Sequence, residues 1–395
     1  MTAPAAAPGQ GLRLVVCIAL VSGLTWAVCR AIGLGAGTPY GVVIGALMVR
    51  PRFDRWPAPV FVLLPVVVLL GLGIGTFLNP LLPPPLVLRF AVVVVIAQLL
   101  AQALPDKLSL VRNVLALLAV LPLLGPDPSW LTAWRQLLAV LVGLVIALVL
   151  QAGLRLPADT GAGAAATAEP GLPHRRLSQR FADPFFLRRL LVAPLSLSIG
   201  MGLGATQPKY LYFGVLLLLN DSLGATLQRV RDRMVGVSLG VLMPWVVFNT
   251  MGTGSISVAL VMGGTTAVVL ALGLEEHLRT ALISSGVTFV GYGVLLDWYI
   301  PDRWLDYLMG SGLALLVCLL MHPFSALRRF RQLAEPLAAA GSGAASSAAP
   351  WPAELASLLP SALEEARVLG QEPAFRRLLG RLPAGGDGGG GAEGR

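Results

Sequence analysis

Charged side chains are scarce in this sequence of 395 residues. They make up 12% of the chain, whereas a soluble globular protein averages about 25%. Hydrophobic residues account for 56%, and apolar runs near the length that crosses a hydrocarbon core of roughly 30 Å recur along the sequence. This composition excludes a soluble globular protein. It predicts a polytopic α-helical membrane protein whose surroundings are the lipid bilayer.

Cysteine and histidine are also rare, with three residues of each. Cys17, Cys29 and Cys318 all lie in apolar runs, whereas disulfides and metal ligands come in pairs or clusters, so we expect packing roles. The sequence has no Gly-rich phosphate-binding loop and no G-x-S-x-G motif. We therefore predict a protein that is not an enzyme, with no catalytic residues, no metal site and no cofactor.

The charge that is present is mostly positive, and arginine supplies nearly all of it. A net charge of +9 would suggest nucleic acid as the partner of a soluble protein. In a membrane protein, cytoplasmic loops collect lysine and arginine by the positive-inside rule. We therefore expect no nucleic-acid partner.

Apolar segments divide the sequence into two similar halves. The first half has them at 12–34, 38–49, 57–78, 86–104, 108–124 and 131–153, and the second at 187–206, 210–221, 232–250, 255–274, 277–296 and 304–322. The phrase GLGAGTPY at Gly33–Tyr40 returns as GLGATQPKY at Gly202–Tyr210, and Pro126–Leu150 resembles Pro301–Met321. These echoes indicate a duplication.

The predicted fold is all-α, with about twelve transmembrane helices in two parallel six-helix repeats, because an even number of crossings gives both copies one orientation. The repeats are 12–153 and 187–331. A cytoplasmic basic linker occupies 154–186, and 332–395 forms a cytoplasmic tail with a linker and short amphipathic helices. With both termini cytoplasmic, most arginines lie on the cytoplasmic side, which favours twelve crossings of the inner (plasma) membrane.

The second segment of each half is unusually short. A helix from Tyr40 to Arg50 rises only about 15 Å, roughly half a bilayer. Pro39 and Pro208 suit helix N-termini, where free N–H groups favour anions. Two explanations remain open: a central anion site between two half-helices, flanked by Tyr40 and Tyr210, or ordinary helices with polar ends.

Ionisable residues follow the second short segment. Asp221 comes directly after an apolar run, so it is either a proton-coupling residue or a helix-end cap. The arginines at 229, 231 and 233 are either topology anchors or groups that attract an anionic substrate. Glu276 and His277 could relay protons, although a short solvated turn explains them as well and is preferred.

The stretch Tyr210–Gly240 resembles the fusaric acid resistance superfamily of aromatic acid exporter-like membrane proteins, which includes bacterial p-hydroxybenzoate efflux proteins and plant malate channels. Its pattern is a short aromatic helix followed by a basic loop of R-x-x-x-R-x-x-G-x-x-x-G type. Arg229, Arg233, Gly236 and Gly240 match it. The resemblance extends over about 12–331, although the arginine stretch RPRFDRWPAPVF in the first half lacks both glycines. Many relatives have large cytoplasmic domains, in place of which we expect only the linker 154–186 and the tail 332–395.

The resemblance implies a secondary transporter that exports small organic anions, aromatic carboxylates in particular, with coupling to protons. Tyr40, Tyr210, Arg229 and Arg233 would then bind substrate, and Asp221 would couple transport to protons. A channel-type anion pore and a non-transporting membrane scaffold are the alternatives. Assembly as a homo-oligomer is left open.

Overall fold

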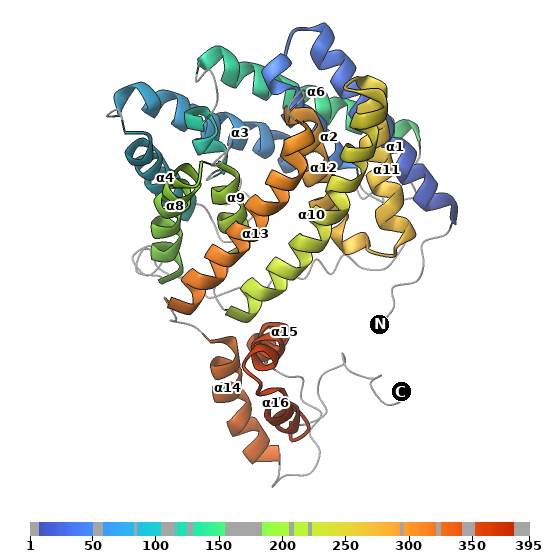
Figure 1. Ribbon diagram of the computed structural model, residues 1–395. Coiled ribbons are helices and arrows are strands. Elements are labelled where there is room, and N and C mark those ends of the chain that lie inside the picture. The colour runs from blue at the N-terminus through green and yellow to red at the C-terminus, as the bar shows by residue number, and fades with distance from the viewer. Residues whose placement is uncertain are drawn as a thin grey trace. The chain divides into compact units, whose positions relative to one another are not determined.

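The computed structural model describes residues 8–49, 58–82, 85–103, 115, 117–124, 129–154, 184–204, 209–219, 223–292, 296–320, 325–341 and 352–382. Their regular structure is helical, which confirms the predicted all-α class (Figure 1). The first group of α-helices is α1 Pro8–Ala31, α2 Thr38–Met48, α3 Ala58–Leu78, α4 Leu86–Ala103 and α6 Trp130–Gly153. The second is α8 Pro184–Gly202, α9 Lys209–Leu218, α10 Leu223–Met251, α11 Ser255–Ala271, α12 Leu278–Tyr292 and α13 Leu296–Leu320. The third is α14 Ala326–Gly341, α15 Ala353–Val368 and α16 Glu372–Leu379.

The chain divides into two compact units. The larger unit comprises Met1–Gly163, Ala193–Gly214 and Asp232–Gly310, and the smaller unit comprises Ala164–Val192, Val215–Arg231 and Ser311–Arg395. Short 3-10 helices η1 Gly35–Gly37, η2 Asn79–Leu81, η4 Pro122–Leu124 and η5 Glu275–His277 connect elements of the larger unit.

Within the described residues, four helices are long and apolar enough to cross a membrane. The spans are Gly11–Ala31, Leu63–Leu81, Trp130–Gly153 and Thr226–Met251. Large apolar side chains such as Leu12, Leu70 and Val149 are exposed on these helices, as expected where lipid is the solvent. A multi-pass membrane protein is therefore supported. The twelve crossings stay a prediction, and much of the fifth segment, 108–124, lies outside the described residues.

Helix α1 packs along α11 through small side chains. A Cβ at Gly23 would press on Ala259, a Cβ at Gly263 would overlap the side chain of Ala19, and Gly11 lies near Leu270. As the residue number rises in one helix it falls in the other, so the two helices are antiparallel (Figure 1). Small residues at such contacts let helix backbones approach closely without any hydrophobic driving force from water.

The ends of α1 and α11 carry the same turn. Gly33 (φ 76°) follows α1 and Gly273 (φ 68°) follows α11, each succeeded by a leucine and a 3-10 helix that leads into the next α-helix. Glycine adopts this left-handed conformation without the steric cost of a Cβ. The left-handed residue ends one helix and lets the chain turn into the next. Because α1 and α11 are antiparallel, the two turns lie at opposite ends of the pair.

Helix α10 begins earlier than the apolar pattern predicts. The sequence places the ninth segment at 232–250, but α10 starts at Leu223 and includes Arg229, Arg231 and Arg233. Arginine, leucine and glutamine are good helix formers, so the helix continues through the charged stretch that ends the apolar run. The basic loop expected from the family pattern is therefore wrong, because these arginines lie on the first turns of a helix.

Helices α14, α15 and α16, called the C-terminal bundle below, form a core of their own within the smaller unit. Its buried side chains are Ala326, Leu327, Phe330, Ala334, Leu355, Ala362, Ala366, Phe375 and Leu382. The rings of Phe330 and Phe375 pack with centroids 5.0 Å apart. The sequence predicts short amphipathic helices in this tail, and the bundle shows where their apolar faces are buried.

Candidate functional site

The short helix α2 packs inside protein along much of its length. Gly37, Gly41 and Gly45 form a stripe against α6. A Cβ at Gly37 or Gly41 would overlap the backbone of Arg135 or Ala139, and one at Gly45 would press on the backbone of Gly143. Contact positions rise together in both helices, so α2 and α6 are parallel. A helix too short to cross the bilayer has to line a cavity or pack within protein, and the described contacts show that the glycine face of α2 packs within protein.

Both ends of α2 are held by polar contacts. Its N-cap, Gly37, offers no side-chain cap, Pro39 lies in the first turn, and the Thr38 hydroxyl donates to the Leu34 carbonyl at 3.4 Å. At the other end, the Gln151 amide donates to the Met48 carbonyl at 3.1 Å. Gln151 is 1% exposed, and satisfying a helix-end carbonyl explains why a polar side chain is buried there.

Tyr40, predicted to bind substrate, is half-buried on α2. It packs against a cluster that includes Leu72 of α3 with Leu137 and Val140 of α6. Tyr210, its predicted partner, is the second residue of α9, and its side chain lies outside the described residues. The structure therefore locates Tyr40 among α3 and α6 but does not test the pairing of the two tyrosines.

Tyr212, which the sequence reasoning missed, is the prominent aromatic residue of α9. Its side chain is fully buried and meets Phe90 of α4 edge to face, with ring centroids 4.8 Å apart. The Phe213 ring lies 5.8 Å away. The repetition of aromatic residues in the α9 sequence KYLYF was the available signal. The two tyrosines of this segment are two residues apart and therefore lie on different faces of a helix, and the sequence does not show which face is buried.

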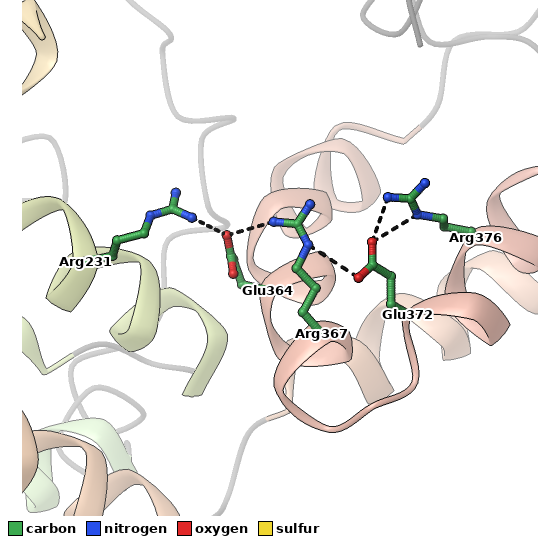
Figure 2. Close-up of polar contacts among 5 residues, drawn as sticks. All are labelled: Arg231, Glu364, Arg367, Glu372 and Arg376. Atoms are coloured by element: carbon green, nitrogen blue, oxygen red, sulfur yellow. Dashed lines mark hydrogen bonds and ion pairs between the residues drawn. The ribbon is translucent and has the colours of Figure 1, made fainter. Parts of the chain in front are cut away.

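The arginines of α10 differ in their surroundings. Arg229 is exposed, whereas Arg233, one helical turn later, is half-buried with its Nη1 atom buried and without a hydrogen-bond partner in the described structure. Arg231 pairs with Glu364 of α15 at 2.9 Å (Figure 2). Asp221, the predicted proton-coupling residue, lies outside the described residues.

The glycines that follow these arginines bring α10 against α12. A Cβ at Gly236 would overlap Thr280, and one at Gly240 would overlap the Ala281 carbonyl and the Ser284 side chain. The positions rise together, so these two helices are parallel. The G-x-x-x-G spacing therefore works here as a packing surface between helices.

Buried hydroxyl groups occur on α1, α11 and α12, and the sequence reasoning did not single them out. Ser22 and Thr25 on α1, and Ser284 and Thr288 on α12, are at most 1% exposed and have no hydrogen-bond partner among the described groups. Thr265 and Ser285 bond to each other at 2.8 Å between α11 and α12. An unpartnered buried hydroxyl costs free energy, which makes these groups candidates for contact with polar cargo. The run of Ser and Thr in α12 was the available signal.

The Glu-Glu-His turn is only partly the solvated turn that the sequence favoured. Glu275 and Glu276 are exposed in η5, but His277 is 7% exposed. Its Nε2 atom lies 3.4 Å from the Glu276 carboxylate. The side chains of all three cysteines are buried, in agreement with packing roles. Among the described residues, no group of three or more His, Cys, Asp or Glu side chains could hold a metal ion.

Comparison with known protein families finds a match in the second half of the chain. The family model described as fusaric acid resistance protein-like matches residues 195–317, which include α9 to α12. No curated protein and no solved structure matches. The matched stretch contains Arg229, Arg233, Gly236 and Gly240, on which the resemblance rests. The resemblance is confirmed, and residues 195–317 are similar to the fusaric acid resistance protein-like family.

Proposed function

We propose that the protein is a secondary transporter that exports small organic anions, aromatic carboxylates in particular, across the inner membrane with coupling to protons. The observation that carries this proposal is the family match over residues 195–317, which covers the short helix α9 and the basic start of α10. Members of this family act in membrane transport, and the apolar spans of the chain suit that role. We therefore assign the protein to transport rather than to enzymatic chemistry.

Arg233 is the best-supported substrate ligand. Its buried Nη1 atom lacks a hydrogen-bond partner in the described structure, and it lies near the start of the apolar span Thr226–Met251. A guanidinium binds a carboxylate through two parallel, charge-assisted hydrogen bonds, so an anionic cargo would satisfy this group. Arg229, exposed one turn earlier, would attract anions to the same helix.

The remaining roles follow the sequence. Tyr40 and Tyr210 would flank the cargo, each on a helix of 11 or 10 residues that is too short to span the bilayer alone. Asp221, just before α10, would take up and release the coupling proton, because an ionisable residue at the membrane boundary is a candidate for proton relay. The buried hydroxyls on α1 and α12 would contact the cargo along its path.

We also propose that the chain crosses the membrane about twelve times, as repeats at 12–153 and 187–331 with both termini cytoplasmic. The helix directions support this. The second and sixth segments (α2, α6) are parallel, as are the ninth and eleventh (α10, α12), whereas the first and tenth (α1, α11) are antiparallel. Twelve consecutive crossings require each of these directions.

The glycines support the duplication as well. Gly71 and Gly75 of the third segment approach Leu118 and Ala119 of the fifth, much as Gly236 and Gly240 of the ninth approach the eleventh. The first half thus carries a Gly-x-x-x-Gly pair at the equivalent contact. It lies further from the arginines along the chain than the family pattern suggests, so the sequence comparison of the arginine stretches missed it.

Counterflow in proteoliposomes tests the transport proposal. Vesicles loaded with unlabelled p-hydroxybenzoate should transiently accumulate the labelled compound, because a carrier exchanges one for the other. Arg233→Gln should slow this exchange at least tenfold, whereas Arg279→Gln, an exposed arginine at the start of α12, should leave it within about twofold. Flux without counterflow would favour the channel-type pore. No flux of any anion in a panel of aromatic and aliphatic carboxylates would favour the scaffold.

A further inference from the structure

The C-terminal bundle is a folded body with an internal anchor, not a loose tail. Glu365 of α15 is completely buried, yet its carboxylate accepts hydrogen bonds from the Ser325 hydroxyl and from the Leu327 backbone N–H at 3.3 Å. These donors belong to the start of α14, where free N–H groups and the helix dipole favour a negative charge. The buried carboxylate therefore fixes α14 against α15.

The same face of α15 meets the first turns of α10 within the smaller unit. A Cβ at Gly224 would overlap the Ser361 carbonyl and press on the Glu365 side chain, so only glycine permits this approach. The Thr226 hydroxyl lies 3.3 Å from the Cys318 sulfur beside it. Backbone contact this close indicates a defined docking surface and not a chance approach of a tail.

One turn from this contact, charged side chains form a chain across the surface. Glu364 accepts from Arg231 at 2.9 Å and from Arg367 at 3.4 Å, and Glu372 joins Arg367 and Arg376 at 3.6 and 2.7 Å (Figure 2). Arg231 is 61% exposed and Glu364 is 19% exposed. An ion pair with so much solvent contact is weak and is screened by salt, so it can exchange partners.

We propose that the C-terminal bundle is an anion-sensitive inhibitory element that docks on α10 through Gly224 and holds Arg231 with the carboxylate of Glu364. This carboxylate presents to α10 the chemical group that an organic anion would present. While Glu364 is bound to Arg231, its negative charge offsets part of the positive charge at the start of α10, which would attract the cargo. A rising concentration of carboxylate competes for Arg231, releases the bundle and increases transport.

The docking does not depend on transport, but the inhibition rests on the proposed function. Hydrogen–deuterium exchange with mass spectrometry on the full chain in nanodiscs follows docking alone, through peptides that cover residues 223–231 and 353–368. Glu364→Gln should raise exchange in both segments by about two- to fivefold. Glu354→Gln, which breaks the Arg329 pair inside the bundle, is the matched control and should leave residues 223–231 unchanged.

Swapping the two charges of the pair keeps the test independent of misfolding. Arg231→Glu alone should raise hydrogen–deuterium exchange in both segments. Arg231→Glu combined with Glu364→Arg should return it to the level of the unmodified protein. Sodium benzoate should raise exchange in the unmodified protein more than sodium chloride at equal ionic strength. Equal effects of Glu364→Gln and Glu354→Gln on residues 223–231, or no rescue by the charge exchange, would overturn the docking.

Counterflow then separates the inhibition from the proposed function. Glu364→Gln should increase the rate at substrate concentrations below saturation by about two- to fivefold. An unchanged rate in a variant whose exchange has risen would overturn the inhibitory role. An unmodified protein that moves no anion, while exchange still responds to benzoate, would overturn the proposed transport and leave the anion-sensitive docking supported.

Discussion

At the scale of single residues, Glu365 shows how a charge can be buried in a small helical bundle. The carboxylate is shielded from water but receives two donors from the start of α14, one of them the hydroxyl of Ser325. The sequence shows only Glu364 and Glu365 side by side on an amphipathic helix. Which of the two faces inward depends on where α14 lies, and that contact is 40 residues away along the chain.

Glu365→Ala should therefore destabilise the C-terminal bundle. Removing a charged acceptor leaves buried donors unsatisfied, which costs about 1.5–3 kcal/mol. Amide exchange of residues 326–341 in the full chain measures this as faster local opening. Glu354→Ala removes an exposed partner of Arg329 and should cost at most about 1 kcal/mol. Equal effects of the two changes would contradict the buried-cap assignment.

Glu372 gives the bundle a predictable response to acid. A hydrogen bond from Arg376 lowers the pKa of Glu372 below its usual value of 4.5, and the charge of Arg367 adds to this. Because the folded pKa is the lower one, the stabilisation is present above about pH 4.5 and is lost as the pH falls through the folded pKa.

Protection of the amides of α16, corrected for the intrinsic pH dependence of exchange, should consequently fall as the pH is lowered below about 4.5, and the fall should be smaller in Arg376→Gln. Protection that increases toward low pH, or an equal fall in both proteins, would be incompatible with this ion pair.

At the scale of elements, helix positions were more predictable than helix contacts. The apolar run at 38–49 predicted α2 within one residue, and 255–274 predicted the start of α11. The run at 232–250 missed the first nine residues of α10, because hydropathy does not register helix formation by charged residues. The glycine stripe of α2 was visible, but its partner α6 was not, since nothing local in the sequence specifies it.

Gly41→Ala tests the contact between α2 and α6. The added Cβ would overlap the Ala139 carbonyl, and such overpacking costs about 1–3 kcal/mol, so the melting temperature of the purified protein should fall. Gly153→Ala at the end of α6 is the control, because a Cβ there meets open space and should be neutral or slightly stabilising. Fluorescence-detected size-exclusion after heating distinguishes the two. Equal melting temperatures of the two variants would contradict the close packing of α2 against α6.

At the scale of the whole molecule, the sequence predicted the membrane class and the resemblance of residues 195–317 to the fusaric acid resistance protein-like family, while the site is a proposal. Composition alone indicated membrane-spanning helices, because a helix that crosses the bilayer needs about 20 predominantly apolar residues. The spacing of Arg229, Arg233, Gly236 and Gly240 indicated the resemblance, and these residues lie within the matched stretch 195–317. Spacing could not show that Arg231 has an internal partner, because Glu364 is 133 residues away.

Because α1 and α11 are antiparallel, we predict that the turns that follow them are exposed on opposite sides of the membrane. Ile32 and Leu272 are each 58% exposed just after these helices. In a background with Cys17, Cys29 and Cys318 replaced by alanine, Ile32→Cys should react with a membrane-impermeant maleimide on intact cells. Leu272→Cys should react only after lysis. Labelling of both positions from one side would contradict the proposed topology.

Active export of an organic anion is the central claim, and an imposed proton gradient tests it most directly. Proteoliposomes containing the unmodified chain and equal concentrations of labelled p-hydroxybenzoate on both sides receive a pH step. The account predicts accumulation on one side above equilibrium, abolished by a protonophore and lost in Asp221→Asn while counterflow persists. The label concentration is corrected for the pH-dependent distribution of the neutral acid, measured in protein-free vesicles. A distribution that never departs from that of the protein-free vesicles would contradict the claim.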